Sequence, residues 1–302
     1  IAGAMFLLTQ DNLLVAGSPR RTAEIDAEAR RALLSQYTGQ AQPAPTPLPP
    51  FPPRVPPLTV RWQRAMASPI AAVKAGPLGT LYGTDGGLVS LLGAAGQPLW
   101  EVDMESRVRS VGFATFAGGK EVCLIGTHAG QAKVLDADTG SELWAYQCED
   151  YSGRVGSVGT IFAADLDGDG THEVVAGADN WHYHALSAHG ELLWRVLTTH
   201  ASTVGCAGDC TGDGRDDIAA GTEYYNVKLL DHAGKTLTTA LGGPVTTAVA
   251  IFDIDGDGKA ESFFGTEDGL VRCLKDKQER AHVPFWQANV GGRYRHKKDG
   301  YL

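Results

Sequence analysis

Short apolar segments alternate with glycine turns at a nearly constant period over most of the chain. A strand that ends in glycine and a small residue recurs with spacings of 43, 51, 44 and 44 residues, at Gly83, Gly126, Gly177, Gly221 and Gly265. A second strand follows each of these, a third carries tryptophan in three repeats, and every unit begins with a further apolar strand. Four short strands in about 44 residues, with no helix between them, are typical of one β-propeller blade. Because a single blade cannot bury both faces, the pattern predicts an all-β protein whose blades stack around an axis.

The N-terminal region predicts one more blade, interrupted by an insertion. Gly17 in AMFLLTQDNLLVAG occupies the position of the repeated glycine, so we expect six four-stranded blades, with seven blades or a piece of a longer propeller as the alternatives. Apolar spacing predicts a short helix at about Thr22–Tyr37, and nine of the fifteen prolines fall at 43–57, which requires an extended segment. LTVRWQRAM, from Leu58, is expected to return as an outer strand. We therefore predict one domain over 1–302, with a helical and proline-rich insertion at 21–57, regular blades at 58–281 and a ring-closing tail at 282–302.

The overall composition excludes some classes of partner. Acidic residues outnumber basic ones 35 to 26, and the net charge of −9 argues against nucleic acid, which needs a clustered basic surface. No apolar run reaches the length of about 18 residues that a membrane span needs. The chain begins at Ile1, and IAGAMFLL lacks the basic start of a signal peptide, so we expect a processed or truncated chain. Among the five cysteines, Cys206 and Cys210 are near enough in sequence to form a disulfide, with buried free thiols as the equal alternative.

Three acidic loops recur between the first and second strands of consecutive blades. They read DLDGDGTHE from Asp165, DCTGDGRDD from Asp209 and DIDGDGKAE from Asp253, at a spacing of 44. Oxygen ligands at positions 1, 3, 5 and 9, with a backbone carbonyl at position 7, can surround a hard cation, and the glycine at position 6 permits the sharp turn. Position 12 is Ala or Phe, which excludes an EF-hand.

We expect three structural calcium sites in these loops. The predicted side-chain ligands are Asp165, Asp167, Asp169 and Glu173; Asp209, Thr211, Asp213 and Asp217; and Asp253, Asp255, Asp257 and Glu261. The predicted backbone ligands are Thr171, Arg215 and Lys259. The middle loop has one carboxylate fewer, because threonine replaces aspartate at its third position, and we expect it to bind calcium most weakly.

Two sets of motifs resemble known propeller repeats. DLDGDGTHEVVAGAD and DIDGDGKAESFFGTEDG resemble the calcium-bearing FG-GAP (VCBS-type) repeats, and DADTGSELW resembles the repeats of quinoprotein-like propellers. The resemblance covers about residues 70–280 and implies a propeller whose calcium loops brace the blades. Such repeats occur in adhesion proteins, lectins, lyases and quinoproteins, so the fold alone does not select a function. Calcium binding by aspartate-rich loops is easiest at millimolar calcium, which favours a secreted or periplasmic protein.

Unusual side chains gather in the segments expected at the other end of the blades, around one mouth of the ring. Antiparallel strands place the turns between second and third strands at the same end as the blade-to-blade connections. The candidates for acid–base chemistry or for neutralising a substrate carboxylate are His182, His200, Tyr224, Tyr225 and Arg154. The candidates for substrate binding are Trp181, Asn180, His128, Tyr151, Glu223 and Asn226. The residues expected only to pack in the interior are Trp100, Trp144, Trp194 and a hydrogen-bonded His184.

Two classes of function fit these residues. One is a polysaccharide lyase, because removing a proton beside a uronate carboxylate requires a base such as histidine or tyrosine and a group that neutralises the carboxylate. Propeller polysaccharide lyases are similar in outline, and the partner would then be an acidic polysaccharide. The other class is a non-catalytic propeller that binds glycans or proteins through the same mouth, as adhesion proteins and lectins do.

Overall fold

A computed structural model describes residues 6–8, 13–15, 60, 62–224, 226–241, 245–267, 269–274 and 286–289. The chain divides into two compact units, one of Ile1–Arg61 with Gln287–Asn289 and one of Trp62–Trp286 with Val290–Leu302. In the first unit, β1 (Phe6–Leu8) pairs antiparallel with β2 (Leu13–Val15). The helix expected at Thr22–Tyr37, the repeat glycine at Gly17 and the proline-rich segment lie outside the described residues.

The second unit consists of the predicted repeats, numbered here as blades 2 to 6. Blade 2 comprises β3 (Ile70–Gly76), β4 (Gly79–Thr84), β5 (Leu88–Leu92) and β6 (Pro98–Asp103). Blade 3 comprises β7 (Val108–Phe116), β8 (Lys120–Thr127), β9 (Gln131–Asp136) and β10 (Glu142–Gln147). Blade 4 comprises β11 (Val158–Ala164), β12 (Glu173–Ala178), β13 (His182–Leu186) and β14 (Leu192–Leu197). Blade 5 comprises β15 (Ser202–Gly208), β16 (Asp217–Thr222), β17 (Asn226–Leu230) and β18 (Thr236–Leu241). Blade 6 begins with β19 (Thr246–Phe252), β20 (Glu261–Thr266) and β21 (Leu270–Leu274), and β22 (Trp286–Asn289) follows in the chain.

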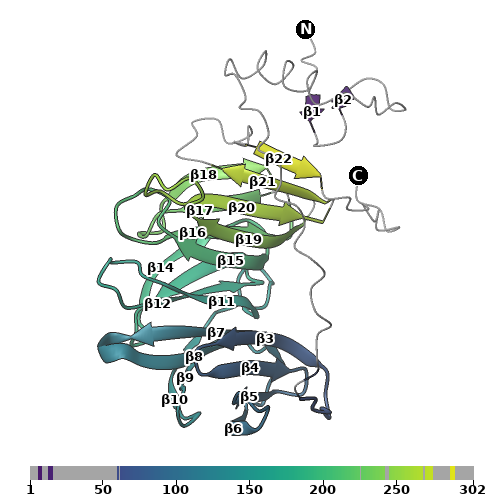
Figure 1. Ribbon diagram of the computed structural model, residues 1–302, viewed down its shortest axis with the longest axis vertical. Coiled ribbons are helices and arrows are strands. Elements are labelled where there is room, and N and C mark those ends of the chain that lie inside the picture. Colours follow the sequence, from purple (N-terminus) through teal and green to yellow (C-terminus); the bar gives the residue numbers. More distant parts are fainter. Residues whose placement is uncertain are drawn as a thin grey trace. The chain divides into compact units, whose positions relative to one another are not determined.

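The strands confirm the all-β prediction and the four-stranded antiparallel blade. Neighbouring strands within blades 2 to 5 pair in chain order, and the first strands β3, β7, β11, β15 and β19 lie beside one another in succession (Figure 1). Within the described residues the only helical segment is a short 3₁₀ turn at Ala117–Gly119. The blade number of six stays a prediction, because the region assigned to blade 1 lies largely outside the described residues.

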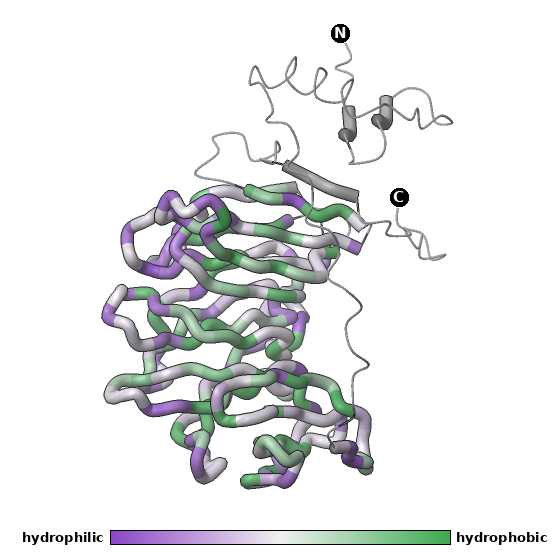
Figure 2. The backbone as a smooth tube through the Cα atoms, in the orientation of Figure 1, coloured by the Kyte–Doolittle hydropathy of each residue, from purple (hydrophilic) through white to green (hydrophobic). Residues whose placement is uncertain are grey.

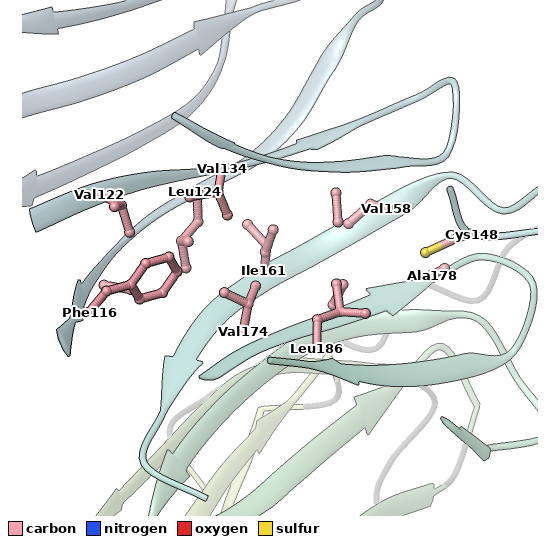
Figure 3. Packing of buried hydrophobic residues seen from close by; sticks show 13 residues of the cluster. Phe116, Val122, Leu124, Val134, Cys148, Val158, Ile161, Val174, Ala178 and Leu186 are labelled. Atoms are coloured by element: carbon pink, nitrogen blue, oxygen red, sulfur yellow. The ribbon is translucent and has the colours of Figure 1, made fainter. Parts of the chain in front are cut away.

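The hydrophobic core lies between successive blades. The strands of the second unit are mainly apolar and the loops at their ends mainly hydrophilic (Figure 2). Side chains from facing sheets interlock between blades 3 and 4, including Phe116, Val122, Leu124, Val134, Val158, Ile161, Val174 and Leu186 (Figure 3). Full burial of one such side chain contributes about 1.5–3 kcal/mol of transfer free energy, so each blade depends on its neighbour for stability.

The repeated tryptophans also join successive blades. The indole N–H of Trp100 donates to Ala137 O at 2.8 Å, Trp144 to Ala188 O at 2.9 Å, and Trp194 to His232 O at 2.9 Å. Each ring lies against a glycine of the next blade, where a Cβ atom would come within 2.8 Å of the ring, at Gly140, Gly190 and Gly234. The expectation that these tryptophans pack in the interior is therefore confirmed.

The outer strand expected in LTVRWQRAM is not present among the described residues, since 62–69 form no strand. A strand requires a neighbour for its backbone hydrogen bonds, and the predicted partners lie outside the described residues. Trp62 nevertheless lies against Gly96 as the other tryptophans lie against their glycines. On β3, Ile70 is 53% exposed, whereas Val108 and Val158 at the same position of blades 3 and 4 are fully buried. The β3 face of blade 2 is thus exposed where the corresponding faces of blades 3 and 4 are covered.

Candidate functional site

Two blade connections and two turns bring the candidate binding residues together at one end of blades 3 to 5. The connections are 148–157 between β10 and β11 and 198–201 between β14 and β15. The turns are 179–181 between β12 and β13 and 223–225 between β16 and β17. Because the strands alternate in direction, all four segments emerge at the same end. The side chains in ring contact here, Tyr151, Arg154, Trp181, His182, His200 and Tyr224, are called the mouth cluster.

Aromatic contacts connect the mouth cluster across blades. The guanidinium carbon of Arg154 lies 5.2 Å from the centre of the Trp181 ring, which is within the range of a cation–π contact. The Trp181 and His200 ring centres are 6.4 Å apart, and those of His200 and Tyr224 are 5.2 Å apart. Tyr151 meets the His182 ring edge-on at 4.8 Å. The cluster therefore offers flat apolar faces together with one guanidinium and histidine nitrogens.

A tight turn presents two members of the cluster. The backbone N–H of Tyr151 donates to Arg154 O at 2.9 Å, and the N–H of Arg154 donates to Tyr151 O at 2.8 Å. The two residues between them have positive φ, 50° at Ser152 and 75° at Gly153. Two central residues with positive φ form a type I′ hairpin turn. The turn therefore places Tyr151 and Arg154 directly opposite one another at its two ends.

Trp181 adopts a backbone conformation that tryptophan rarely tolerates. Its φ is 69°, and the equivalent residues in blades 2, 3 and 6 are all glycines with positive φ, at Gly87, Gly130 and Gly269. A left-handed conformation costs an L-residue roughly 1–2 kcal/mol. In addition, the indole N–H of Trp181 is buried and has no hydrogen-bond partner among the described residues. Local strain and an unsatisfied donor at one residue are typical of a functional position.

A cavity of about 420 Å³ adjoins the mouth cluster. Arg154 and Glu223 line it, and Arg109 from β7 lies within it, where its guanidinium bonds Asp179 and donates to Ser157 Oγ at 2.8 Å. Ser202, at the start of β15, also lines the cavity; it is 4% exposed, and its hydroxyl has no hydrogen-bond partner among the described residues.

The sequence reasoning missed Arg109, Asp179, Ser157 and Ser202. Three of these lie at or next to the start of the first strand of a blade, which lines the cavity. The one available signal was Arg109, a charged residue in the otherwise apolar RSVGFATF strand. His128, which the sequence placed among the binding residues, lines the same cavity and its Nδ1 lies 3.3 Å from Ser157 Oγ.

Several candidate residues are buried or form hydrogen bonds with the surrounding backbone. His182 is only 7% exposed, its Nδ1 lies 2.9 Å from Asn180 O, and burial lowers its pKa. Asn180 is 2% exposed and its amide group donates to Glu149 O at 2.7 Å, so it holds the connection to the turn. Asn226 lies in β17, where its carbonyl accepts from the Thr222 hydroxyl at 2.7 Å. Tyr225 lies outside the described residues.

His184 is buried as expected but only half satisfied. It is 2% exposed, its Nδ1 lies 3.3 Å from the Tyr146 hydroxyl, and its Nε2 has no partner among the described residues. The expectation of a hydrogen-bonded interior histidine is therefore confirmed at Nδ1 alone, because no polar group of the described residues reaches Nε2. Burial, followed by the neighbouring His182, lowers the pKa of His184 to about 4.

The acidic loops lie at the opposite end of the strands and share one local geometry. In each loop the first aspartate accepts backbone N–H groups of the residues that follow, such as Gly168 N and Gly170 N on Asp165. The acid at position 9 is buried and accepts the N–H of position 2 in all three loops, at Glu173, Asp217 and Glu261. Position-5 carboxylates turn instead to the N–H of position 7, at Asp169, Asp213 and Asp257.

Carboxylate oxygens converge in the first and third loops. Asp165, Asp167 and Glu173 bring oxygens within 4.8 Å of one another, and so do Asp253, Asp255 and Glu261. In the middle loop, Thr211 replaces the second acid of this trio, and the described residues form no such group there. The middle loop instead contains two buried oxygens without hydrogen-bond partners among the described residues, Thr211 Oγ1 and Asp217 Oδ1. Burial raises the pKa of Asp217 to about 7.

Backbone hydrogen bonds connect consecutive loops. The N–H of Asp216 donates to Asp165 O at 2.7 Å, and the N–H of Ala260 donates to Asp209 O at 2.7 Å. The N–H of His172 donates to Thr115 O of blade 3 in the same way at 3.0 Å. The acidic loops therefore join the blades at this edge, and nothing in their contacts suggests a catalytic role. The cysteines are all free, so the alternative of a Cys206–Cys210 disulfide is wrong.

None of the described residues forms a helix that is long and apolar enough to cross a membrane.

Comparison with known proteins assigns the chain to a family. A search of curated proteins finds no match to the chain. The model of one family, described as outer membrane protein assembly factor BamB, matches residues 85–239, about half of the chain and all of blades 3 and 4. This match agrees with the quinoprotein-like resemblance of the DADTGSELW repeat. The chain therefore belongs to the BamB-type family of β-propellers.

Proposed function

We propose that the chain is a binding propeller of the cell envelope that recognises a protein partner at the mouth cluster. The observation that carries the proposal is Trp181, whose strained backbone and unsatisfied indole N–H are retained at the centre of an aromatic cluster. Tryptophan, tyrosine and arginine are the side chains most enriched at energetic centres of protein interfaces. The family description, an outer membrane assembly factor, supports a protein partner and an envelope location.

The proposal is tested by capture with the full chain and its variants. The wild type, Trp181→Gly and Thr199→Gly are immobilised and exposed to a cell-envelope extract, and one retained protein is purified for calorimetry. Thr199 is the matched control, because it also has a positive φ, 67°, and within the described part of the chain its hydroxyl bonds only the neighbouring Thr198 O. We expect Trp181→Gly to weaken binding at least tenfold, as for an interface hot spot, and Thr199→Gly to bind as the wild type. A purified partner that binds Trp181→Gly as tightly as the wild type contradicts the proposal.

A polysaccharide lyase is the second candidate. It is favoured by two proton-transfer groups, His200 and Tyr224, whose rings are 5.2 Å apart and which connect through Trp181 to Arg154. One would remove the proton beside a uronate carboxylate while Arg154 neutralises that carboxylate. Ultraviolet absorbance of an unsaturated uronate during incubation with a panel of uronate polysaccharides tests this. A signal that His200→Ala and Tyr224→Ala abolish would establish the lyase, and no signal across the panel rejects it.

We further propose that the three acidic loops bind calcium and that the ions brace the blades. The residues fit a hard cation, because carboxylate oxygens converge in the first and third loops. The middle loop has a fully buried carboxylate oxygen at Asp217 that has no hydrogen-bond partner among the described residues. When bound, the cation would supply positive charge to carboxylates that otherwise repel one another. Asp165, Asp167 and Glu173 would hold it in the first loop, Asp209 and Asp217 in the middle one, and Asp253, Asp255 and Glu261 in the third.

A further inference from the structure

We infer that the cavity beside the mouth cluster recognises a peptide segment that carries both a carboxylate and a cationic group, with Arg154 binding the carboxylate and Glu223 the cation. The inference rests on the proposed binding function and names the class of ligand. The cavity, at about 420 Å³, is near the lower end of the range for ligand pockets. It therefore has room for one or two side chains of a partner rather than for a folded surface.

Two of the charged side chains that line the cavity pair with each other, and two have no charged partner among the described residues. Arg109 and Asp179 form an ion pair with each other, so neither is available to neutralise a ligand. Arg154 forms no ion pair among the described residues, and its guanidinium is held over Trp181 at the end of the type I′ turn. Glu223 is fixed through its backbone N–H, which donates to Ala201 O at 3.0 Å, and its carboxylate has no partner among the described residues. A ligand thus meets one free positive and one free negative group.

Ser202 forms part of the cavity wall, but its hydroxyl is enclosed. The residue is 4% exposed, and its hydroxyl has no hydrogen-bond partner among the described residues. The Oγ atom lies close to Gly177 of β12, where a Cβ atom would come within 2.8 Å of it. Ser202 therefore shapes the wall, and the charges of Arg154 and Glu223 are the groups that a ligand meets.

The arrangement of charge favours a peptide over a uronate polysaccharide. A polyuronate carries a carboxylate on every sugar, so a chain with one carboxylate at Arg154 would bring others toward Glu223. Like charges in a confined site cost binding energy and act against the wrong ligand. A peptide can place a lysine or arginine beside an aspartate or glutamate, so that its cation meets Glu223 and its carboxylate meets Arg154.

The test uses the full chain and three blocked dipeptides at millimolar concentration, followed by NMR titration. The probes are acetyl-Lys-Glu-amide, acetyl-Gln-Glu-amide and acetyl-Lys-Gln-amide, with trigalacturonate as the glycan arm. We expect acetyl-Lys-Glu-amide to bind about tenfold more tightly than either singly charged probe, a difference of about 1.4 kcal/mol, because each singly charged probe leaves one free charge of the cavity without a partner. Arg154→Gln should remove the advantage given by glutamate, and Glu223→Gln the advantage given by lysine. Arg107→Gln is the matched control, because Arg107 pairs with Asp85 and does not line the cavity.

The outcomes separate this inference from the proposed function. Equal binding of the three dipeptides, or no binding of any, overturns the inference. Tighter binding of trigalacturonate that Arg154→Gln abolishes overturns the peptide class in favour of a glycan. The proposed function is judged by the separate dependence of partner capture on Trp181. A partner lost with Trp181→Gly, together with charge-insensitive probes, would keep the binding function and reject this ligand class.

Discussion

The backbone at Trp181 gives the sharpest prediction of stability. Two substitutions, Trp181→Ala and Trp181→Gly, remove the same indole and its contacts with Arg154 and His200. They differ in the backbone, because alanine retains the strain of a φ of 69° and glycine does not. The difference between the two variants therefore isolates the cost of the left-handed conformation.

The magnitude follows from two opposing terms. Relief of the left-handed conformation favours glycine by roughly 1–2 kcal/mol. The larger conformational freedom of glycine in the unfolded chain opposes this by roughly 0.5–1 kcal/mol. We therefore expect Trp181→Gly to have a free energy of unfolding about 0.5–1 kcal/mol above that of Trp181→Ala, or a Tm about 1–4 °C higher.

Urea unfolding of the two variants measures the difference. The control pair is Val155→Ala and Val155→Gly, at an exposed residue of the 148–157 connection that has no positive φ. At this position the order should reverse, with glycine less stable by about 0.5–1 kcal/mol. If Trp181→Gly proves no more stable than Trp181→Ala while the control pair behaves as expected, the left-handed backbone at Trp181 is not strained.

Three further predictions concern pH, blade contacts and the acidic loops. The pKa of His184 is about 4 in the folded chain and about 6.5 in the unfolded chain, so stability is complete above pH 6.5 and falls as the pH drops toward 4. His184→Gln should remove about 2–3 kcal/mol of the acid-induced loss in the free energy of unfolding, measured by urea unfolding at several pH values. If the variant loses stability with falling pH as steeply as the wild type, His184 is not the group responsible. Gly190→Ala should lower the free energy of unfolding by about 2–4 kcal/mol, because the new Cβ would lie 2.8 Å from Trp144. Gly118→Ala, at a similar φ with no atom within 4 Å, should lower it by only about 1–2 kcal/mol. Equal losses in thermal melts would show that the Trp144 contact adds nothing. Chelation should lower the Tm of the wild type. Asp217→Asn should melt above the wild type in chelator and below it in millimolar calcium, because the buried charge of Asp217 is unfavourable without a cation. The same order of Tm values in both conditions would argue against a cation at this loop.

Much of the fold was predictable because blade structure is encoded locally. The glycine turns, the alternation of apolar residues and the strand length each depend on a few neighbouring residues. The strand boundaries around Gly126, Gly177 and Gly221 therefore agree with the repeats seen in the sequence. The loop aspartates were recognisable for the same reason, since their hydrogen bonds lie within nine residues of chain. The outer strand expected around Trp62 is not formed by the described residues 62–69, and its pairing would depend on distant residues.

The sequence by itself determined the blade type, the order of the blades and the end of each blade at which Trp181 and the acidic loops emerge. Only the tertiary structure decided which side chains act together, because contacts across blades depend on how neighbouring sheets pack. Arg109 reaches Asp179, 70 residues away, and so leaves Arg154 and Glu223 as the free charges of the cavity. Whether a histidine is reachable or enclosed is decided in the same way, and no local pattern distinguishes His182 from His200.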